Sequence, residues 1–219
     1  MIQAFLFDLD GVLTDTSEFH FLAWKRLAED LGISFTRQEN EALRGVSRRE
    51  SLALLLKGRP VSETEATAMM EQKNRYYLEL VEKMTPSSLL PGAKEILEEL
   101  GRLRLKRVIV SVSKNAPLVI ERLQLIPLID GLVDGNAPAR SKPFPDLFLL
   151  AANKFGLKPT DCLVVEDAAA GIEAAHAAGM LALGLGPFAR VGKAELVLAS
   201  LAGQQAADIL AKIEKWMWF

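Results

Sequence analysis

The chain begins with a short apolar run and then changes to a pattern with helical spacing. Residues 4–7 read Ala-Phe-Leu-Phe, which is the length and composition of a buried strand, and an acidic turn follows. From residue 18 to residue 31, apolar residues recur at three- and four-residue steps, and Gly32 ends this predicted helix. Further helices are predicted over 37–43, 48–56 and 63–83. Residues 16–88 therefore contain helices and no clear strand.

Beyond residue 88 the pattern alternates between strands and helices. Strands are predicted over 107–111, 132–133, 162–166, 181–184 and 195–198. Helices are predicted over 93–103, 118–123, 145–155, 169–178 and 206–215. Such alternation is typical of right-handed βαβ units around a parallel sheet. We therefore predict an α/β fold whose Rossmann-like core comprises residues 1–15 and 89–219, with residues 16–88 inserted as a helical cap domain.

The composition indicates a globular protein and excludes several classes of partner. Of the 219 residues, 50% are hydrophobic, and 26 basic residues against 28 acidic ones leave a net charge of −2. This balance gives no electrostatic signal for nucleic acid or an anionic membrane. No apolar run reaches the ~18 residues that span a bilayer, and the N-terminus lacks the positive region of a signal peptide. We expect a cytoplasmic monomer.

Any metal bound by this chain is predicted to have oxygen ligands. Cys162 is the single cysteine, which excludes an internal disulfide and a multi-cysteine zinc site. The two histidines, His20 and His176, leave little room for a histidine-based cluster. A bound metal would therefore be a hard cation held by carboxylates.

Acidic and hydroxyl side chains occur where three of the predicted strands end. The segments are Asp8-Leu9-Asp10-Gly11, Ser111-Val112-Ser113-Lys114-Asn115 and Glu166-Asp167. The carboxyl ends of parallel strands meet at one edge of the sheet, where ligands bind. Acids from two strand ends suit Mg²⁺, and hydroxyls with amides at a helix N-terminus suit phosphate. With Lys142, beside Pro143, to balance charge, the set predicts a magnesium-dependent phosphoryl-transfer site.

Each of these motifs also has a simpler interpretation when it is taken alone. Asp-Gly is a common turn, Ser-x-Ser after a strand caps a helix, and Glu166-Asp167 suits the dipole of the helix that follows. A single lysine such as Lys142 is ordinarily on the surface. The occurrence of all four motifs at strand ends or between them favours the catalytic interpretation.

Together and in this order, the motifs resemble those of the haloacid dehalogenase superfamily of phosphotransferases, over nearly the whole chain. Within it the sequence is most similar to the β-phosphoglucomutases. This similarity is carried by Thr14-Asp15-Thr16, His20-Phe21, Trp24, Arg44-Gly45-Val46-Ser47-Arg48, Ser51, Gln72-Lys73-Asn74 and Ser111 to Asn115. Arg44 and Ala168 depart from the pattern, because a lysine and a serine are usual there. Arginine keeps the positive charge but changes the hydrogen-bond geometry.

The resemblance implies a role for each residue at the strand ends. Asp8 would be the nucleophile that forms an aspartyl-phosphate, and Asp10 would be the general acid and base. Magnesium would be bound by Asp8, the main-chain carbonyl of Asp10, Glu166 and Asp167. The transferring phosphoryl group would be held by Ser111, the Val112 amide and Lys142.

The resemblance also implies a sugar-phosphate substrate. The distal phosphate would be held by Arg48, Ser113, Lys114 and Asn115. The sugar pocket and cap closure would involve His20, Trp24, Arg44, Gly45, Ser51 and Lys73. The implied reaction interconverts β-D-glucose 1-phosphate and β-D-glucose 6-phosphate, with glucose 1,6-bisphosphate as intermediate and activator.

Two other functions remain open. A sugar-phosphate phosphatase on the same scaffold would let water attack the aspartyl-phosphate. A non-catalytic phosphosugar-binding module is the third possibility, and the intact Asp8 and Asp10 argue against it because binding alone needs neither a nucleophile nor a proton donor.

Other prominent residues are predicted to be structural. Trp216, Trp218 and Phe219 are expected to pack the last helix on the core. Arg49, beside Arg48, is expected on the solvated surface.

Overall fold

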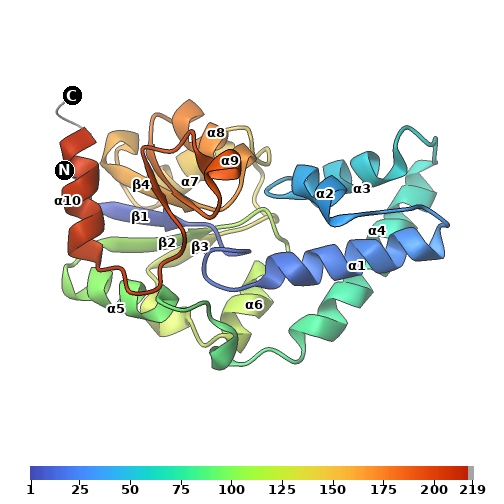
Figure 1. The fold of residues 1–219 in the computed structure, drawn as a ribbon, viewed down its shortest axis with the longest axis horizontal. Helices are drawn as coiled ribbons and strands as arrows, with labels where there is room; N and C mark the ends of the chain where they lie inside the picture. Colours follow the sequence, from blue (N-terminus) through green and yellow to red (C-terminus); the bar gives the residue numbers. More distant parts are fainter. Residues whose placement is uncertain (217–219) are drawn as a thin grey trace.

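The computed structural model describes residues 1–216, which form a sheet lobe and a helical lobe (Figure 1). The strands are β1 (Ala4–Phe7), β2 (Lys106–Val110), β3 (Gly131–Val133), β4 (Cys162–Glu166), β5 (Leu181–Leu185) and β6 (Leu196–Leu198). They pair in parallel in the order β3-β2-β1-β4-β5-β6, which confirms the predicted α/β fold. The strand order reverses at β1, so β1, β2 and β4 present adjacent carboxyl ends at the position where such sheets bind ligands.

Helices cover both faces of the sheet. One face carries α5 (Ala93–Arg102), α6 (Ala116–Arg122) and α10 (Ala206–Trp216), and the other carries α7 (Asp146–Lys154) and α8 (Ala169–Ala177). Phe5 and Phe7 pack with the first group, and Ala4 and Leu6 pack with the second, because successive strand residues point to opposite faces. All four residues of β1 are buried, which is why the strand is an uninterrupted apolar run.

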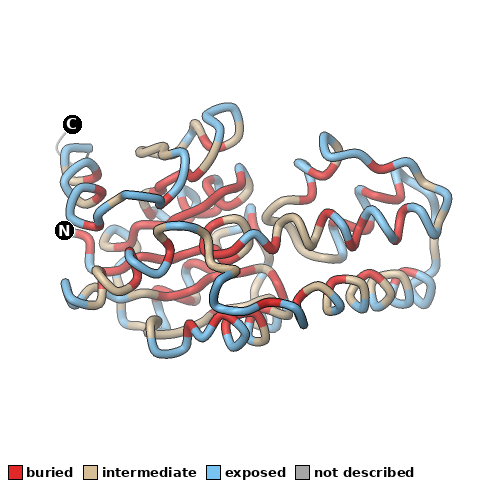
Figure 2. The backbone as a smooth tube through the Cα atoms, turned by 60° about the horizontal axis from the view of Figure 1, so that its bottom comes forward, coloured by how far each residue is buried: buried red, intermediate tan, exposed pale blue. Residues whose placement is uncertain are grey.

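The helical lobe contains α1 (Thr16–Asp30), α2 (Arg37–Asn40), the 3₁₀ turn η1 (Glu41–Leu43), α3 (Arg48–Leu56) and α4 (Glu63–Val81). It has an apolar core of its own, which includes Phe21, Trp24, Leu27, Leu52 and Leu55. Capping boxes begin α2, α3 and α4. Figure 2 shows the buried positions of this lobe on the inner sides of its helices. No helix within residues 1–216 is long and apolar enough to cross a bilayer.

The remaining elements are short turns that connect the larger ones. They are η2 (Pro86–Ser88), η3 (Ile126–Leu128), η4 (Pro159–Asp161) and the helix α9 (Phe188–Val191). The sequence pattern did not predict α9, because four residues are too few to show a helical period.

One expectation about the helices is refined by the structure, and a second is wrong. The helix predicted over 37–43 is divided, because the α-helical hydrogen bonding ends at Asn40 and a 3₁₀ turn follows. Trp216 is 59% exposed, whereas α10 buries Ala206, Ile209 and Ile213. Trp216 follows the last of these buried positions, so it does not join them in the core. Trp218 and Phe219 lie outside the described residues.

Candidate active site

Three carboxylates at the ends of β1 and β4 meet at one point. Asp8, Glu166 and Asp167 are buried, and each offers an oxygen within 4.8 Å of the oxygens of the others. The register of the sheet causes this, because β1 and β4 are paired neighbours and Phe7 lies opposite Val165. Three hard oxygen donors at this spacing fit Mg²⁺. The carboxylate of Asp10 is not in this group, and the sequence had assigned to Mg²⁺ only its main-chain carbonyl.

Lys142 lies against this acidic cluster, and the cluster occupies its donors. Its Nζ donates to Asp8 Oδ1 at 2.6 Å, to the Val110 carbonyl at 3.2 Å and to Glu166. A lysine ammonium has three donors, so none is left for a ligand in this arrangement. The Lys142 side chain is fully buried and does not line the cavity described below. It balances the acidic charge beside Asp8, and its predicted contact with the phosphoryl group stays a prediction.

Burial dominates the pKa values of the cluster. It raises the pKa of Asp8 despite the opposing charge of Lys142, and it raises the pKa of Glu166 to about 8 and that of Asp167 to about 7. The charge of Asp8 raises the last two further. Burial lowers the pKa of Lys142, but the two carboxylates outweigh it and raise that pKa above its usual range. A divalent cation here would favour the ionised carboxylates.

Asp10 is held differently from Asp8. Thr16 Oγ1 donates to its Oδ1 at 2.5 Å, Ser111 Oγ donates to its Oδ2 at 3.4 Å, and His20 Nε2 lies 3.6 Å from Oδ1. Burial raises the pKa of Asp10, but the nearby His20, the hydrogen bond from Thr16 and the charge of Lys73 outweigh it, so this pKa is below its ordinary value. The lowered pKa favours the ionised form of the Asp10 carboxylate.

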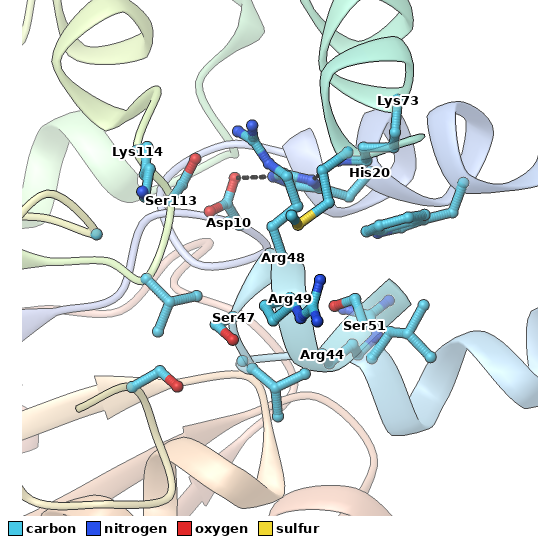
Figure 3. Close-up of a pocket in the computed structure, with 18 of the residues that line it drawn as sticks. Asp10, His20, Arg44, Ser47, Arg48, Arg49, Ser51, Lys73, Ser113 and Lys114 are labelled. Atoms are coloured by element: carbon cyan, nitrogen blue, oxygen red, sulfur yellow. Dashed lines mark hydrogen bonds and ion pairs between the residues drawn. The ribbon is translucent and has the colours of Figure 1, made fainter. Parts of the chain in front are cut away.

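A series of contacts extends from Asp10 into the helical lobe (Figure 3). His20 on α1 places Nδ1 2.6 Å from Lys73 Nζ on α4, and its ring stacks on Tyr77 at 4.2 Å. Lys73 Nζ also lies 5.1 Å from the centroid of the Trp24 ring. Burial and neighbouring positive charge lower the pKa of both His20 and Lys73. The position of α4 is thus coupled to that of Asp10.

A cavity of about 690 Å³ separates the two lobes. Of the predicted site residues, the sheet lobe contributes Asp8, Asp10, Val112, Ser113, Lys114 and Asp167 to its lining. The helical lobe contributes His20, Trp24, Arg44, Gly45, Arg48, Ser51 and Lys73. Arg48 and Lys114 form no ion pair within residues 1–216, and Figure 3 shows both at the wall near Asp10. Two unpaired cations there suit an anionic ligand.

Four predicted residues do not line the cavity, namely Ser111, Asn115, Lys142 and Glu166. Ser111 is buried, and its Oγ accepts from the Ser113 amide at 3.0 Å as well as donating to Asp10. Asn115 Nδ2 donates to Asn74 Oδ1 at 2.7 Å, across the two lobes. Ser111 and Asn115 therefore connect parts of the site, and their predicted phosphate contacts stay predictions.

Arg44 and Arg49 lie in the predicted regions, and each forms an ion pair that the sequence did not indicate. Arg44 lines the cavity, but its Nη1 donates to Asp167 Oδ2 at 2.5 Å, so its charge is directed at the acidic cluster. Arg49 also lines the cavity, where it forms an ion pair with Glu63. Its side chain is 49% exposed, which confirms the expected surface position. Glu63, Thr67 and Glu71, three further lining residues, are four apart, and this helical spacing would have indicated a common face.

The sequence and the fold both match known proteins. The profile of the haloacid dehalogenase-like hydrolases matches residues 2–179. The β-phosphoglucomutase of Bacillus subtilis (strain 168) is 42% identical over 98% of this chain and 96% of its own. The phosphorylated carbohydrates phosphatase of Thermotoga maritima is 30% identical over 95% of this chain and 97% of its own.

Comparison with a crystal structure also shows similarity to a β-phosphoglucomutase. The β-phosphoglucomutase of Clostridium difficile matches with a TM-score of 0.95 and 36% identity, over 100% of both chains. The chain therefore belongs to the haloacid dehalogenase-like hydrolase family.

Proposed function

We propose that this chain interconverts β-D-glucose 1-phosphate and β-D-glucose 6-phosphate, through a phospho-aspartyl enzyme and a glucose 1,6-bisphosphate intermediate. The observation that carries this proposal is Arg48, a guanidinium without an ion-pair partner in residues 1–216, in the wall of the cavity that also contains Asp8. A mutase must hold a second phosphate away from its nucleophile, whereas a phosphatase need not. The similarity to two β-phosphoglucomutases supports the same function.

The proposal also covers the domain organisation, the location and the partner of the enzyme. Residues 16–88 act as a cap over a core made of residues 1–15 and 89–219. The enzyme is a cytoplasmic monomer, and its partner is a small sugar phosphate.

The chemistry begins from the phosphorylated form of Asp8. Asp10, ionised in the resting site, takes the proton from a sugar hydroxyl, and the hydroxyl oxygen attacks the phosphorus of the aspartyl-phosphate. The bond to the Asp8 oxygen breaks, which gives the bisphosphate and a carboxylate. After the sugar turns over, Asp8 attacks the other phosphate, and Asp10 returns its proton to the leaving sugar oxygen.

The surrounding residues provide charge and position for these steps. Asp8, Glu166 and Asp167, with the Asp10 carbonyl, would hold Mg²⁺, which neutralises negative charge on the phosphoryl group when bound. Ser113 and Lys114 precede α6 at the cavity wall and contact the distal phosphate with Arg48.

Hydrolysis is the second candidate function, and the 30% identity to a phosphorylated carbohydrates phosphatase favours it. In that case water attacks the aspartyl-phosphate, and inorganic phosphate leaves. The two candidates share Asp8, Asp10 and the magnesium cluster. They differ in what must be held on the cap side of the cavity.

Product analysis separates the two candidates. The full chain is mixed with β-glucose 1-phosphate, Mg²⁺ and a trace of glucose 1,6-bisphosphate, and phosphorus NMR follows the products. The expected result is glucose 6-phosphate, a strong requirement for the bisphosphate, and little inorganic phosphate. The α-anomer in a parallel sample controls for sugar recognition. Release of inorganic phosphate at the rate of sugar consumption would favour the phosphatase instead.

A further inference from the structure

Four residues of alternating charge connect the helical lobe to Asp167, and we refer to Glu41, Arg44, Asp167 and Arg190 as the Asp167 ring. Arg44 donates from Nη1 to Asp167 Oδ2 at 2.5 Å and from Nε to Glu41 Oε1 at 3.2 Å. Arg190 donates from Nη1 to Glu41 Oε2 at 3.3 Å and from Nε to the main-chain carbonyl of Asp167 at 2.6 Å. Arg190 Nη2 also lies 3.9 Å from Asp167 Oδ2. The ring therefore joins both lobes to one residue of the acidic cluster.

The local backbone leaves room for this arrangement. Gly186 has a φ of +118°, and a Cβ built there would lie 2.6 Å from Arg190 Nη2. Glycine alone adopts this conformation readily and leaves space for the guanidinium. On the opposite side, a Cβ at Gly45 would lie 3.3 Å from Ala168 Cβ. Arg44 and Ala168, the two departures from the usual family pattern, therefore both lie at this contact between the lobes.

We propose that Arg190 is a positioning residue for Asp167. It holds the carbonyl of the residue that directly follows β4, and Glu41 of the helical lobe orients its guanidinium. The inference rests on the proposed use of Asp8, Glu166 and Asp167 as the magnesium site. Arg190 does not line the main cavity, so it acts through Asp167 and does not contact the substrate. Partners that orient a metal ligand typically contribute about 10–100-fold to metal affinity or activity.

If Arg190 acted only through its charge, its removal would change the metal affinity in the opposite direction. A guanidinium close to a ligand carboxylate repels a divalent cation, so its removal would strengthen metal binding. A positioning role predicts that removal of Arg190 weakens metal binding, because the main-chain carbonyl of Asp167 then loses the hydrogen bond from Arg190. The direction of the change in metal affinity therefore distinguishes the two roles.

The test measures metal binding directly on the metal-free full chain. Mn²⁺ alone is titrated, free Mn²⁺ is followed by electron paramagnetic resonance, and Mg²⁺ is then added as a competitor. Arg190→Gln is expected to weaken binding about tenfold. Arg190→Lys keeps the charge but loses the planar fork, and it is expected to weaken binding similarly. The matched control is Lys193→Gln, because Lys193 is exposed and pairs with Glu173 at 3.0 Å.

Two further measurements separate positioning from general destabilisation. At saturating Mg²⁺ the kcat of Arg190→Gln should stay within about twofold of wild type, while the Mg²⁺ concentration needed for half-maximal activity rises by the same factor as Kd. Glu41→Ala, which breaks the ring from the helical lobe, should weaken Mn²⁺ binding by about threefold. If Arg190→Gln does not fold, Arg190→Lys and Glu41→Ala provide the same test.

The outcomes also separate this inference from the proposed function. Failure of the wild-type chain to bind Mn²⁺ would contradict the magnesium site itself. Wild-type binding together with unchanged or tighter binding by Arg190→Gln and Arg190→Lys would overturn only the role of Arg190.

Discussion

Charged side chains of the two lobes are held in different ways. In the sheet lobe, Lys142 is paired with both Asp8 and Glu166, and the side chains of Asp8, Lys142 and Glu166 are 8%, 0% and 0% exposed. In the helical lobe, Arg48 has no ion-pair partner within the described residues, and the Arg49 side chain is 49% exposed. Buried and hydrogen-bonded charges are held in one geometry, whereas unpaired or exposed charges remain available to a ligand.

The difference follows from how each lobe is held together. The Asp8 amide donates to the Val165 carbonyl at 2.9 Å, and the Ser111 amide donates to the Val133 carbonyl at 3.0 Å. These hydrogen bonds continue the pairing of the sheet, so they fix where the catalytic edge lies. The helical lobe has an apolar core of its own, and Ala23, Tyr77 and Val81 of its helices also pack into the larger core of the sheet lobe. We infer that the sheet lobe carries the chemistry and the helical lobe carries the selectivity.

Polar contacts connect the lobes beside candidate catalytic positions. Ser141, which precedes Lys142, donates to Glu50 at 2.8 Å. Asn115 contacts Asn74, and Arg44 contacts Asp167. A movement of the helical lobe therefore acts directly on the loops that hold the site.

The strongest test of the fixed sheet lobe is Asp8→Asn. The amide cannot form an acyl-phosphate and is a poorer metal ligand, so turnover should fall more than about a thousandfold, or ~4 kcal/mol of barrier. Steady-state rates measure the loss, and circular dichroism checks the fold. Asp15→Asn is the matched control, because Asp15 is exposed in the same loop, and it should retain activity. Greater residual activity in a folded Asp8→Asn would contradict its role as nucleophile.

The next largest effect is expected in the helical lobe, from Arg48→Ala. Loss of a charge-assisted contact to the distal phosphate should cost about 2–4 kcal/mol in the mutase step. Slow hydrolysis of the phosphoenzyme should continue, because water needs no anchor on the cap side. Both rates are measured on one preparation. If both rates fell equally, or neither changed, the division of roles between the lobes would be wrong.

Asp167 lies where the lobes meet, and we expect its ionisation to make both metal affinity and stability depend on pH. Burial raises its pKa to about 7 and that of the neighbouring Glu166 to about 8, and a protonated carboxyl is a poor ligand, so Mg²⁺ affinity should rise at least about tenfold between about pH 6 and 8. In the metal-free chain the folded state holds a proton that the unfolded state releases at lower pH. The free energy of unfolding should therefore fall as pH rises from about 4, near the ordinary pKa of an aspartate, to about 7, and should level off above that.

Metal titrations between about pH 6 and 8 and urea unfolding between about pH 4 and 8 measure the two effects. Asp167→Asn provides the comparison, because it removes this ionisation while keeping a similar shape. A metal affinity independent of pH in the wild-type chain would show that Asp167 is already ionised at pH 6.

The sequence predicted the sheet lobe and its catalytic edge because the relevant signals are local. The apolar run of β1 identifies a buried strand, and Asp8 follows it directly. In a parallel sheet, residues at the ends of neighbouring strands must then lie close together, as Asp8 and Glu166 do. The approximate placement of these side chains therefore needed no knowledge of tertiary contacts.

Contacts between the lobes could not be predicted in this way. Arg44 and Asp167 are 123 residues apart, and Glu41 and Arg190 are 149 apart, so no local period relates them. The burial of Lys142 could not be predicted from the sequence either. A Lys-Pro pair does not show that neighbouring oxygens accept from all three donors of the ammonium group. Such details depend on how the helical lobe and the loops pack on the sheet.

The smallest effect is expected from Arg49→Ala, which tests how finely the helical lobe selects its ligand. Arg49 lines the cavity beside Arg48, but it is paired with Glu63, whose side chain is 83% exposed. Exposed ion pairs are worth little, and salt screens them. The variant should therefore keep kcat/KM for β-glucose 1-phosphate within about threefold, which is below 1 kcal/mol. A tenfold loss, measured beside Arg48→Ala, would mean that both arginines bind phosphate and that the Glu63 pair opens when substrate enters.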